Sequence, residues 1–138
     1  MMDQTDSLDS EATATEGLKV LVVDDSRTMR RLLVRMLNSI GITDIAQAEH
    51  GEEALERLAE EIPDLAMVDW NMPVMNGLDF VKALRENSEW ECVKVMMVTS
   101  ETNPRQIYEA LRAGADEYAM KPIDGGIITD KLAMLGLS

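Results

Sequence analysis

Residues 20–26, VLVVDDS, decide the fold, because a fully apolar run leads directly into two adjacent acids. Four apolar residues in succession are typical of a strand that is buried on both faces, as in parallel sheets. The two acids repel each other, and burial strengthens the repulsion. The stretch therefore indicates either acids that cap a helix at the surface or a site that supplies compensating positive charge.

Outward from this stretch, short apolar runs alternate with helical patterns. We expect strands at residues 18–23, 44–48, 65–68, 93–98 and 116–120. Apolar residues at helical spacing predict helices at 29–40, 52–61, 78–84 and 104–113, and a last helix after Gly125-Gly126 through Leu135. This alternation predicts an α/β fold, a doubly wound five-stranded parallel sheet with helices on both faces.

Length and composition restrict the domain organisation and the classes of function. The 138 residues suffice for one domain, at 18–138, and residues 1–17 contain five acids and no Lys or Arg, which predicts a disordered acidic tail. A net charge of −13 argues against a nucleic-acid-binding surface. The chain has one cysteine, one histidine and no long apolar run, so we expect a cytoplasmic protein without disulfide, zinc site or membrane insertion.

Reactive side chains follow four of the predicted strands. Asp24 and Asp25 follow the first, Asp69 the third, Thr99 the fourth and Lys121 the fifth. In a parallel sheet these strand ends lie along one edge, where such folds bind their ligands. Each feature alone has an ordinary interpretation, as a helix cap, a turn former or a solvated lysine. Their arrival together at one edge is what indicates a site.

Three carboxylates at one place need a cation. Oxygen ligands without histidine or cysteine favour a hard ion, Mg²⁺ or Mn²⁺, and Mg²⁺ also ligates phosphate. A carboxylate can act as a nucleophile and form an aspartyl phosphate. Asp69 stands alone at the end of the middle strand, so we expect it to be attacked while Asp24 and Asp25 hold the metal. Lys121 and Thr99 are suited to hold the phosphoryl oxygens.

The motifs at these positions resemble those of a known family. VVDDS, TMRRLL, VDWNMPVMNG, VTSE and GADEYAMKP are together similar to the response-regulator receiver domains of two-component signalling, and most like the single-domain, CheY-type chemotaxis regulators. The resemblance covers about residues 18–137. It implies the strand order 2-1-3-4-5 of the flavodoxin-like and CheY-like folds. It also implies a receiver domain with no output domain.

The resemblance assigns roles to the residues of the predicted site. Asp69 is expected to be the phosphoacceptor, with Mg²⁺-dependent self-phosphorylation from small donors and autodephosphorylation. Asp25 is expected to ligate Mg²⁺ directly and Asp24 mainly through water, and the backbone carbonyl of Asn71 completes the protein ligands. The resemblance therefore implies a phosphoacceptor switch protein and not an enzyme.

Further positions are expected to tune the switch. The resemblance implies that Thr99 and Lys121 contact the phosphoryl group, that Tyr118 turns inward when Thr99 is pulled toward it, and that the Lys121–Pro122 bond is cis. Asn71 and Glu101 flank the path of the hydrolytic water in the family, and this pair predicts a phosphoryl lifetime of seconds. Ser100 departs from the alanine common in chemotaxis regulators and is expected to bias the position of Tyr118.

The resemblance also predicts partners. A histidine kinase of the CheA type is expected to supply the phosphoryl group to a monomer, and a surface formed by Arg105, Tyr108, Glu109 and Arg112 together with Tyr118 is expected to bind a downstream protein. A flagellar motor switch protein, a role as a phosphorelay intermediate and a role as a phosphate sink stay open.

Two other classes were weighed against the regulator. A phosphatase of the haloacid-dehalogenase class would place its nucleophile in a D-x-D arrangement after the first strand, whereas Asp24 and Asp25 are adjacent. A flavodoxin-like redox module would need a phosphate-binding loop where these two acids stand. Both alternatives are disfavoured by the sequence.

Overall fold

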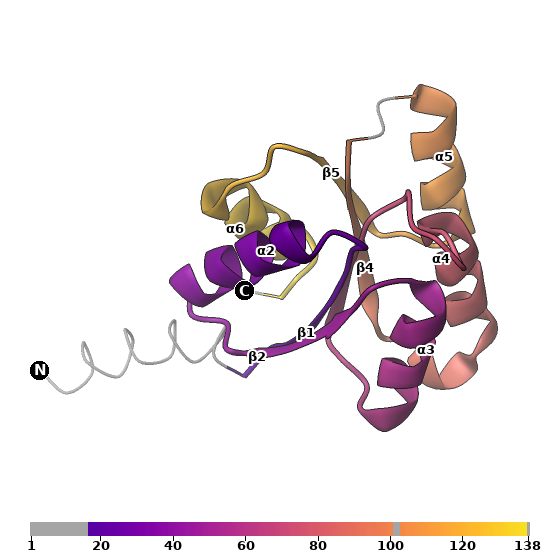
Figure 1. Cartoon of the computed structure of the whole chain (residues 1–138), viewed down its shortest axis with the longest axis horizontal. Coiled ribbons are helices and arrows are strands. Elements are labelled where there is room, and N and C mark those ends of the chain that lie inside the picture. Colours follow the sequence, from indigo (N-terminus) through magenta and orange to yellow (C-terminus); the bar gives the residue numbers. More distant parts are fainter. Residues whose placement is uncertain (1–16, 101–102, 138) are drawn as a thin grey trace, which may run out of the picture.

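Five parallel strands form one sheet in the order β2-β1-β3-β4-β5 (Figure 1). The structure, a computed structural model, describes residues 17–100 and 103–137. Residues 1–16 of the predicted tail and Glu101 therefore lie outside the described residues. The strands are β1 (Lys19–Val23), β2 (Asp44–Ala48), β3 (Leu65–Val68), β4 (Lys94–Thr99) and β5 (Glu117–Met120). The predicted fold class and strand order are confirmed.

Helices cover both faces of this sheet (Figure 1). One face carries α2 (Arg27–Ser39) and α6 (Gly125–Met134), and the other carries α3 (Gly51–Glu60), α4 (Gly77–Glu86) and α5 (Pro104–Ala113). A short 3-10 helix, η1 (Ser88–Trp90), which no sequence pattern indicated, joins α4 to β4. Within the described ranges, no helix has the length and hydropathy needed to cross a bilayer.

The central strands are buried on both faces, which explains why they read as continuous apolar runs. Along β1, Leu21 and Val23 pack into the cluster under α3, α4 and α5, whereas Val20 and Val22 pack into the cluster under α2 and α6. Each such side chain contributes about 1.5–3 kcal/mol when it leaves water. Two cores of this kind hold the strand ends, and hence the site, in fixed positions.

Polar side chains define where the helices begin. The hydroxyl of Ser26 accepts a hydrogen bond from the Met29 amide at the start of α2, and Nδ1 of His50 accepts one from the Glu53 amide at the start of α3. Such N-caps satisfy amides that have no partner within the helix. As a result, α2 begins two residues earlier than predicted. The residue that caps α2 is thus Ser26, and not one of the two acids before it.

Two expectations about the helices are wrong in detail. The apolar spacing within 29–40 predicts that Leu32 lies on the buried face of the helix, yet Leu32 is 43% exposed, while Arg30 is buried with Leu33 and Leu37. The helix is rotated so that Arg30 reaches polar partners at the strand ends. The last helix is predicted to begin after Gly125 and Gly126, but these residues form the first turn of α6, with Asp124 as the N-cap.

Candidate functional site

Asp24, Asp25 and Asp69 meet at the carboxyl edge of the sheet. Each contributes a carboxylate oxygen to a group whose members all lie within 4.8 Å of one another. Because Val23 pairs with Val68 in adjacent strands, the residues that follow are brought level. Asp24 and Asp69 are buried and Asp25 is exposed. The three predicted carboxylates therefore form one cluster that is open to solvent at Asp25.

Lys121 brings a positive charge into this cluster. Its Nζ lies 2.9 Å from Oδ2 of Asp24 and 3.5 Å from Oδ2 of Asp69. It follows β5, so its side chain passes the end of β4 to reach Asp69, which follows β3, and the ends of β4 and β3 to reach Asp24, which follows β1. The repulsion between neighbouring buried carboxylates is thus offset by one ammonium group placed between two of them.

Every polar group of Asp24 forms a hydrogen bond or an ion pair within the protein. Its amide donates to the Ala48 carbonyl at 3.1 Å, and its own carbonyl accepts a hydrogen bond from Nη1 of Arg30 at 2.6 Å. Its Oδ1 accepts a hydrogen bond from the Ser26 amide at 2.9 Å, and its Oδ2 is paired with Lys121. Its carboxylate is therefore less available to a metal than that of its exposed neighbour in the chain.

Asp69 is a carboxylate in an unfavourable environment for charge. Burial raises its pKa, the Lys121 ammonium opposes this, and the negative charge of Asp24 raises the pKa further. Hydrogen bonds from the Thr99 hydroxyl and the Trp70 amide, the latter 2.8 Å from Oδ1, act in the opposite direction, but the pKa stays above its usual value. A positive ion at this place would lower it.

The loop after β3 borders a depression beside these acids. The depression has a volume of about 520 Å³ and is lined by Asp25, Trp70, Asn71, Met72, Pro73 and Asn76. Asn71 is exposed at its rim. Open volume therefore lies next to Asp25, beside the loop from which the sequence predicted a ligand, Asn71.

Gly77 fixes the start of α4 against the phosphoacceptor candidate. Its amide donates to the Trp70 carbonyl at 2.8 Å, and a Cβ on this residue would collide with the backbone carbonyl of Asp69. Glycine is required here because of this close approach. No sequence pattern reveals this contact.

Val74 sits in the same loop with a positive φ of 67°. The Met75 amide donates to the Pro73 carbonyl at 2.6 Å, which makes Val74 the central residue of a tight three-residue turn. A β-branched residue is disfavoured in this conformation. The loop therefore carries local strain a few residues from the acidic cluster.

The remaining predicted tuning residues lie on or near the last two strands. Thr99 is the final residue of β4 and fully buried, Ser100 is exposed, and Tyr118 is half-buried against the core under α5. The Lys121–Pro122 peptide is cis, as expected. These positions bring Thr99 and Lys121 to the acids, whereas Tyr118 lies within β5, before the strand end that carries Lys121.

The predicted output residues share the outer face of α5. Arg105, Tyr108, Glu109 and Arg112 are all exposed, and Tyr108 is 61% accessible. They form no part of the acidic cluster. The structure thus gives them the exposure that a docking surface needs.

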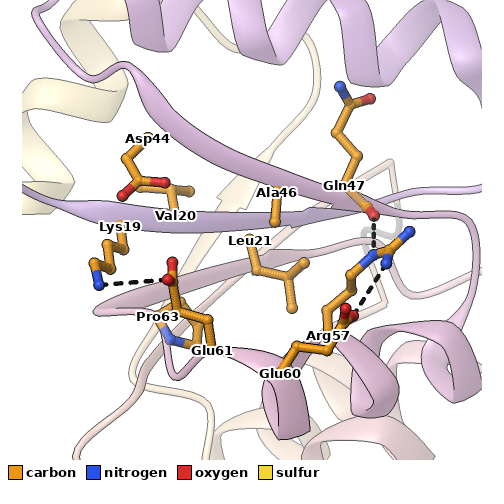
Figure 2. A pocket seen from close by; sticks show the side chains of 10 residues that line it. All are labelled: Lys19, Val20, Leu21, Asp44, Ala46, Gln47, Arg57, Glu60, Glu61 and Pro63. Atoms are coloured by element: carbon orange, nitrogen blue, oxygen red, sulfur yellow. Dashed lines mark hydrogen bonds and ion pairs between the residues drawn. The ribbon is translucent and has the colours of Figure 1, made fainter.

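A second groove lies at the opposite edge of the sheet, between β2 and the end of α3 (Figure 2). Its volume is about 450 Å³, and its charged groups are largely paired with each other, Lys19 with Glu61 at 3.6 Å and Arg57 with Glu60 at 3.1 Å. No group of convergent carboxylates is found there among the described residues. The chemistry is therefore concentrated at the carboxyl edge.

The donor set of the cluster fits a hard divalent cation. It consists of carboxylate oxygens, with no histidine or cysteine, and Mg²⁺ binds such ligands while keeping several waters. The exposure of Asp25 and the depression beside it leave room for those waters. A hard divalent cation, as predicted from the sequence, is therefore compatible with the geometry of the cluster.

Comparisons with known proteins agree with this geometry. The chemotaxis protein CheY1 of Helicobacter pylori is 41% identical over 119 residues, covering 86% of this chain and 96% of that protein. A chemotaxis protein CheY homolog of Campylobacter jejuni is 41% identical over 116 residues, covering 83% and 89%. Among solved structures, Vibrio cholerae chemotaxis protein CheY4 is similar with a TM-score of 0.79 and 34% identity, covering 86% of this chain and 98% of that one.

The family assignment follows from a match along nearly all of the described domain. The family model for the response regulator receiver domain matches residues 20–133, a range that contains every strand end of the acidic cluster. The same range contains Lys121 and the loop after β3. The chain belongs to the response regulator receiver domain family.

Proposed function

We propose that this protein is a chemotaxis response regulator that accepts a phosphoryl group on Asp69 with Mg²⁺. The observation that carries the proposal is the cluster itself, three carboxylates within 4.8 Å of one another with Lys121 paired to two of them. The similarity to chemotaxis proteins of three bacteria supports the biological setting. As a receiver domain of the CheY type, the chain is a switch protein rather than a classical enzyme.

In the proposed transfer, a carboxylate oxygen of Asp69 attacks phosphorus, and the bond from phosphorus to the donor breaks as the new bond forms. The leaving group, the imidazole of a kinase phosphohistidine or the acetate of acetyl phosphate, departs with the electron pair of the broken bond, and the imidazole takes up a proton. Mg²⁺, when bound, supplies charge neutralisation to the phosphoryl oxygens. Asp25 is the proposed direct ligand because it is the exposed acid, with the Asn71 carbonyl beside it and Asp24 acting through water.

Lys121 changes partners in this scheme. It is now paired with Asp24 and lies 3.5 Å from Asp69, so a phosphoryl group on Asp69 would offer it new negative oxygens. The Thr99 hydroxyl already forms a hydrogen bond with Asp69, and it would donate to another of the phosphoryl oxygens. We propose that this movement of Thr99 makes room for Tyr118 to turn inward, and that Ser100, the exposed residue directly after Thr99, biases that movement.

The lifetime of the phosphoryl group depends on access of water. Asn71 is exposed at the rim of the depression, and Glu101, which lies outside the described residues, is proposed as its counterpart. With this pair we expect a half-life of seconds in the isolated protein. A half-life of hours would contradict the assignment of these two tuning positions.

A kinase of the CheA type is the proposed donor, acting on a monomer in the cytoplasm. The exposed face of α5, with Arg105, Tyr108, Glu109 and Arg112, is the proposed docking surface for the downstream protein. A flagellar motor switch protein is the proposed target. Capture of a downstream phosphotransfer protein would instead indicate a phosphorelay intermediate, and capture of no partner would indicate a phosphate sink.

Phosphorylation with acetyl phosphate tests the chemistry. The protein is incubated with Mg²⁺ and acetyl phosphate, and its intact mass is recorded at once. We expect a gain of one phosphoryl group that is lost with EDTA and in Asp69→Asn, but kept in Asp130→Asn, which removes an exposed carboxylate from α6. Because a short-lived adduct can escape detection, beryllofluoride, a stable phosphoryl mimic, is titrated in parallel. Absence of both the mass gain and beryllofluoride binding would refute the proposal.

A further inference from the structure

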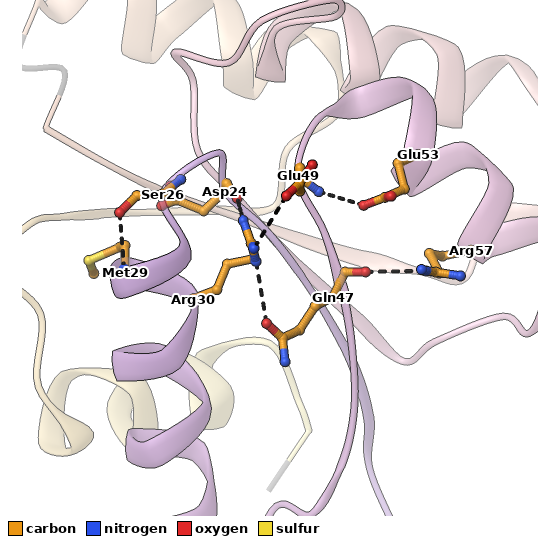
Figure 3. Close-up of polar contacts among 8 residues, drawn as sticks. All are labelled: Asp24, Ser26, Met29, Arg30, Gln47, Glu49, Glu53 and Arg57. Carbon is orange, nitrogen blue, oxygen red and sulfur yellow. Dashed lines mark hydrogen bonds and ion pairs between the residues drawn. The ribbon is translucent and has the colours of Figure 1, made fainter.

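Arg30 is the one lysine or arginine in the buried class within the described part of the chain, at 7% exposure. Burying a guanidinium is costly unless it is hydrogen-bonded, so its partners show what it does. Nη1 donates to the carbonyl of Asp24 at 2.6 Å, and Nε donates to Oε1 of Gln47 at 3.3 Å (Figure 3). Nη2 lies 3.7 Å from the Glu49 carboxylate.

The contacts of Arg30 link α2 to the end of β1 and to β2 at the carboxyl edge of the sheet. Gln47 belongs to β2, and Glu49 follows that strand. The Glu49 amide donates to Oε1 of Glu53, in the first turn of α3, at 2.7 Å (Figure 3). The planar fork of arginine suits such a role because several donors point in fixed directions. The guanidinium is therefore anchored on one side and holds Asp24 on the other.

The atom that Arg30 holds belongs to the peptide between the two acids. The carbonyl of Asp24 lies in one plane with the amide nitrogen and Cα of Asp25. On its other side, the Asp24 amide is bonded to the Ala48 carbonyl at 3.1 Å. Fixing both peptides fixes the direction in which the chain leaves Asp24, and with it the place of the Asp25 carboxylate.

We propose that Arg30 is a positioning residue of the metal site, which orients the Asp24–Asp25 peptide so that Asp25 faces the ion. It touches neither the ion nor the phosphoryl group. This inference rests on the proposed Mg²⁺-dependent function. Groups that orient metal ligands in this way change metal affinity about 10- to 100-fold when they are removed.

If Arg30 acted through its charge alone, its removal would change the Mg²⁺ affinity in the opposite direction. A guanidinium near the cluster repels a divalent cation, so removing only its charge would tighten Mg²⁺ binding. Arg30→Lys separates the two roles, because lysine keeps the charge and loses the fork. Arg30→Gln removes both. If positioning dominates, both variants bind Mg²⁺ more weakly.

The test measures the Mg²⁺ dissociation constant through Trp70 fluorescence, in a Trp90→Phe background so that one tryptophan reports. The free energy of unfolding in EDTA is measured on the same samples. We expect Arg30→Lys to weaken Mg²⁺ binding about tenfold. Arg31→Lys, an exposed neighbour on the same helix, is the matched control and should bind as the parent does.

Gln47→Met provides a second test that does not depend on the fold of the Arg30 variants. It removes a surface amide that anchors the guanidinium, and we expect weaker Mg²⁺ binding in the same direction. The inference is overturned if Arg30→Lys and Gln47→Met bind Mg²⁺ as the parent does, whatever their stability, or if Arg30→Gln binds more tightly. If the parent protein itself shows no Mg²⁺ binding, the proposed function fails and this inference with it.

Discussion

At the scale of single residues, Asp69 stands out because it is buried where negative charge is already present. Burial is the main cause of its raised pKa, with Asp24 adding to it and Lys121, Thr99 and the Trp70 amide opposing it. An acid with a raised pKa binds its proton more tightly in the folded state. Stability therefore falls as the pH rises from the unfolded pKa to the folded pKa, and stays lower above that window.

Replacement of this acid should stabilise the protein without metal. We expect Asp69→Asn in EDTA to be more stable than the parent at pH 7 by about 0.5–2 kcal/mol, a gain typical of relieving strain at an active site. The gain should shrink as the pH is lowered through the pKa of Asp69. Urea unfolding across this pH range measures it, with Asp130→Asn as the exposed control. An Asn variant less stable than the parent at neutral pH would contradict the prediction.

Val74 offers a second test at this scale. Its φ of 67° and 72% exposure mean that it is strained and packs little. Asparagine tolerates this conformation, so we expect Val74→Asn to raise the free energy of unfolding by about 1 kcal/mol. Val74→Ile keeps the β-branch and should show no gain. Equal stability of the two variants in urea unfolding would argue against strain at this turn.

At the scale of elements, an ion pair ties α6 to β5. Nζ of Lys131 lies 3.0 Å from Oε1 of Glu117, which also accepts a hydrogen bond from the Tyr118 amide at 3.0 Å. Burial acts to raise the pKa of Glu117, but the Tyr118 amide and Lys131 together lower it. The stability gained from a lowered pKa is present above the unfolded pKa and is lost as the pH falls through the folded pKa.

The contribution of this ion pair should depend on pH. We expect Glu117→Gln to lose up to about 1 kcal/mol at pH 7, the upper range for a partly exposed pair, and less at acid pH. Lys131→Met should lose a similar amount, and the double variant less than the sum of the two. Urea unfolding of the four proteins measures this double-mutant cycle. Fully additive losses would show that the pair does not couple the two elements.

The sequence predicted strands and helices correctly where burial determines the pattern of apolar residues. β1, β3 and β4 are buried on both faces, so their apolar runs stand out, and the predicted range 104–113 agrees with α5, which Asn103 caps and Gly114 ends. The rotation of α2 was missed because a buried arginine and an exposed Leu32 reverse the usual pattern. Arg30 could have been noticed only as a charge three positions before Leu33, on the side that packs against the sheet.

At the scale of the whole molecule, the strand order determines which site residues come together. The acids and Lys121 could be predicted from the sequence because they follow strands and a parallel sheet aligns strand ends. Contacts that depend on side-chain reach could not, such as the pairing of Lys121 with Asp24 and the approach of Gly77 to Asp69. Short sequence patterns report burial and chain direction, and they do not report which polar groups meet.

Binding of Mg²⁺ should stabilise the entire fold, because the three acids converge only in the native sheet. At a free Mg²⁺ concentration 100 times the dissociation constant, the expected gain is about 2.7 kcal/mol. Urea unfolding with Mg²⁺ and with K⁺ at equal ionic strength measures the gain. Asp25→Asn, a surface change, should lose most of it. The same gain with K⁺, or an undiminished gain in Asp25→Asn, would place the stabilisation elsewhere.

The position of Lys121 after the last strand has a consequence for the order in which the chain is made. All three acids are synthesised before β4, yet the ammonium that pairs with two of them emerges only after β5. A nascent chain that has assembled its first four strands holds a charge cluster without its counter-ion. The charge of the cluster is therefore balanced by Lys121 only once the final strand has been made.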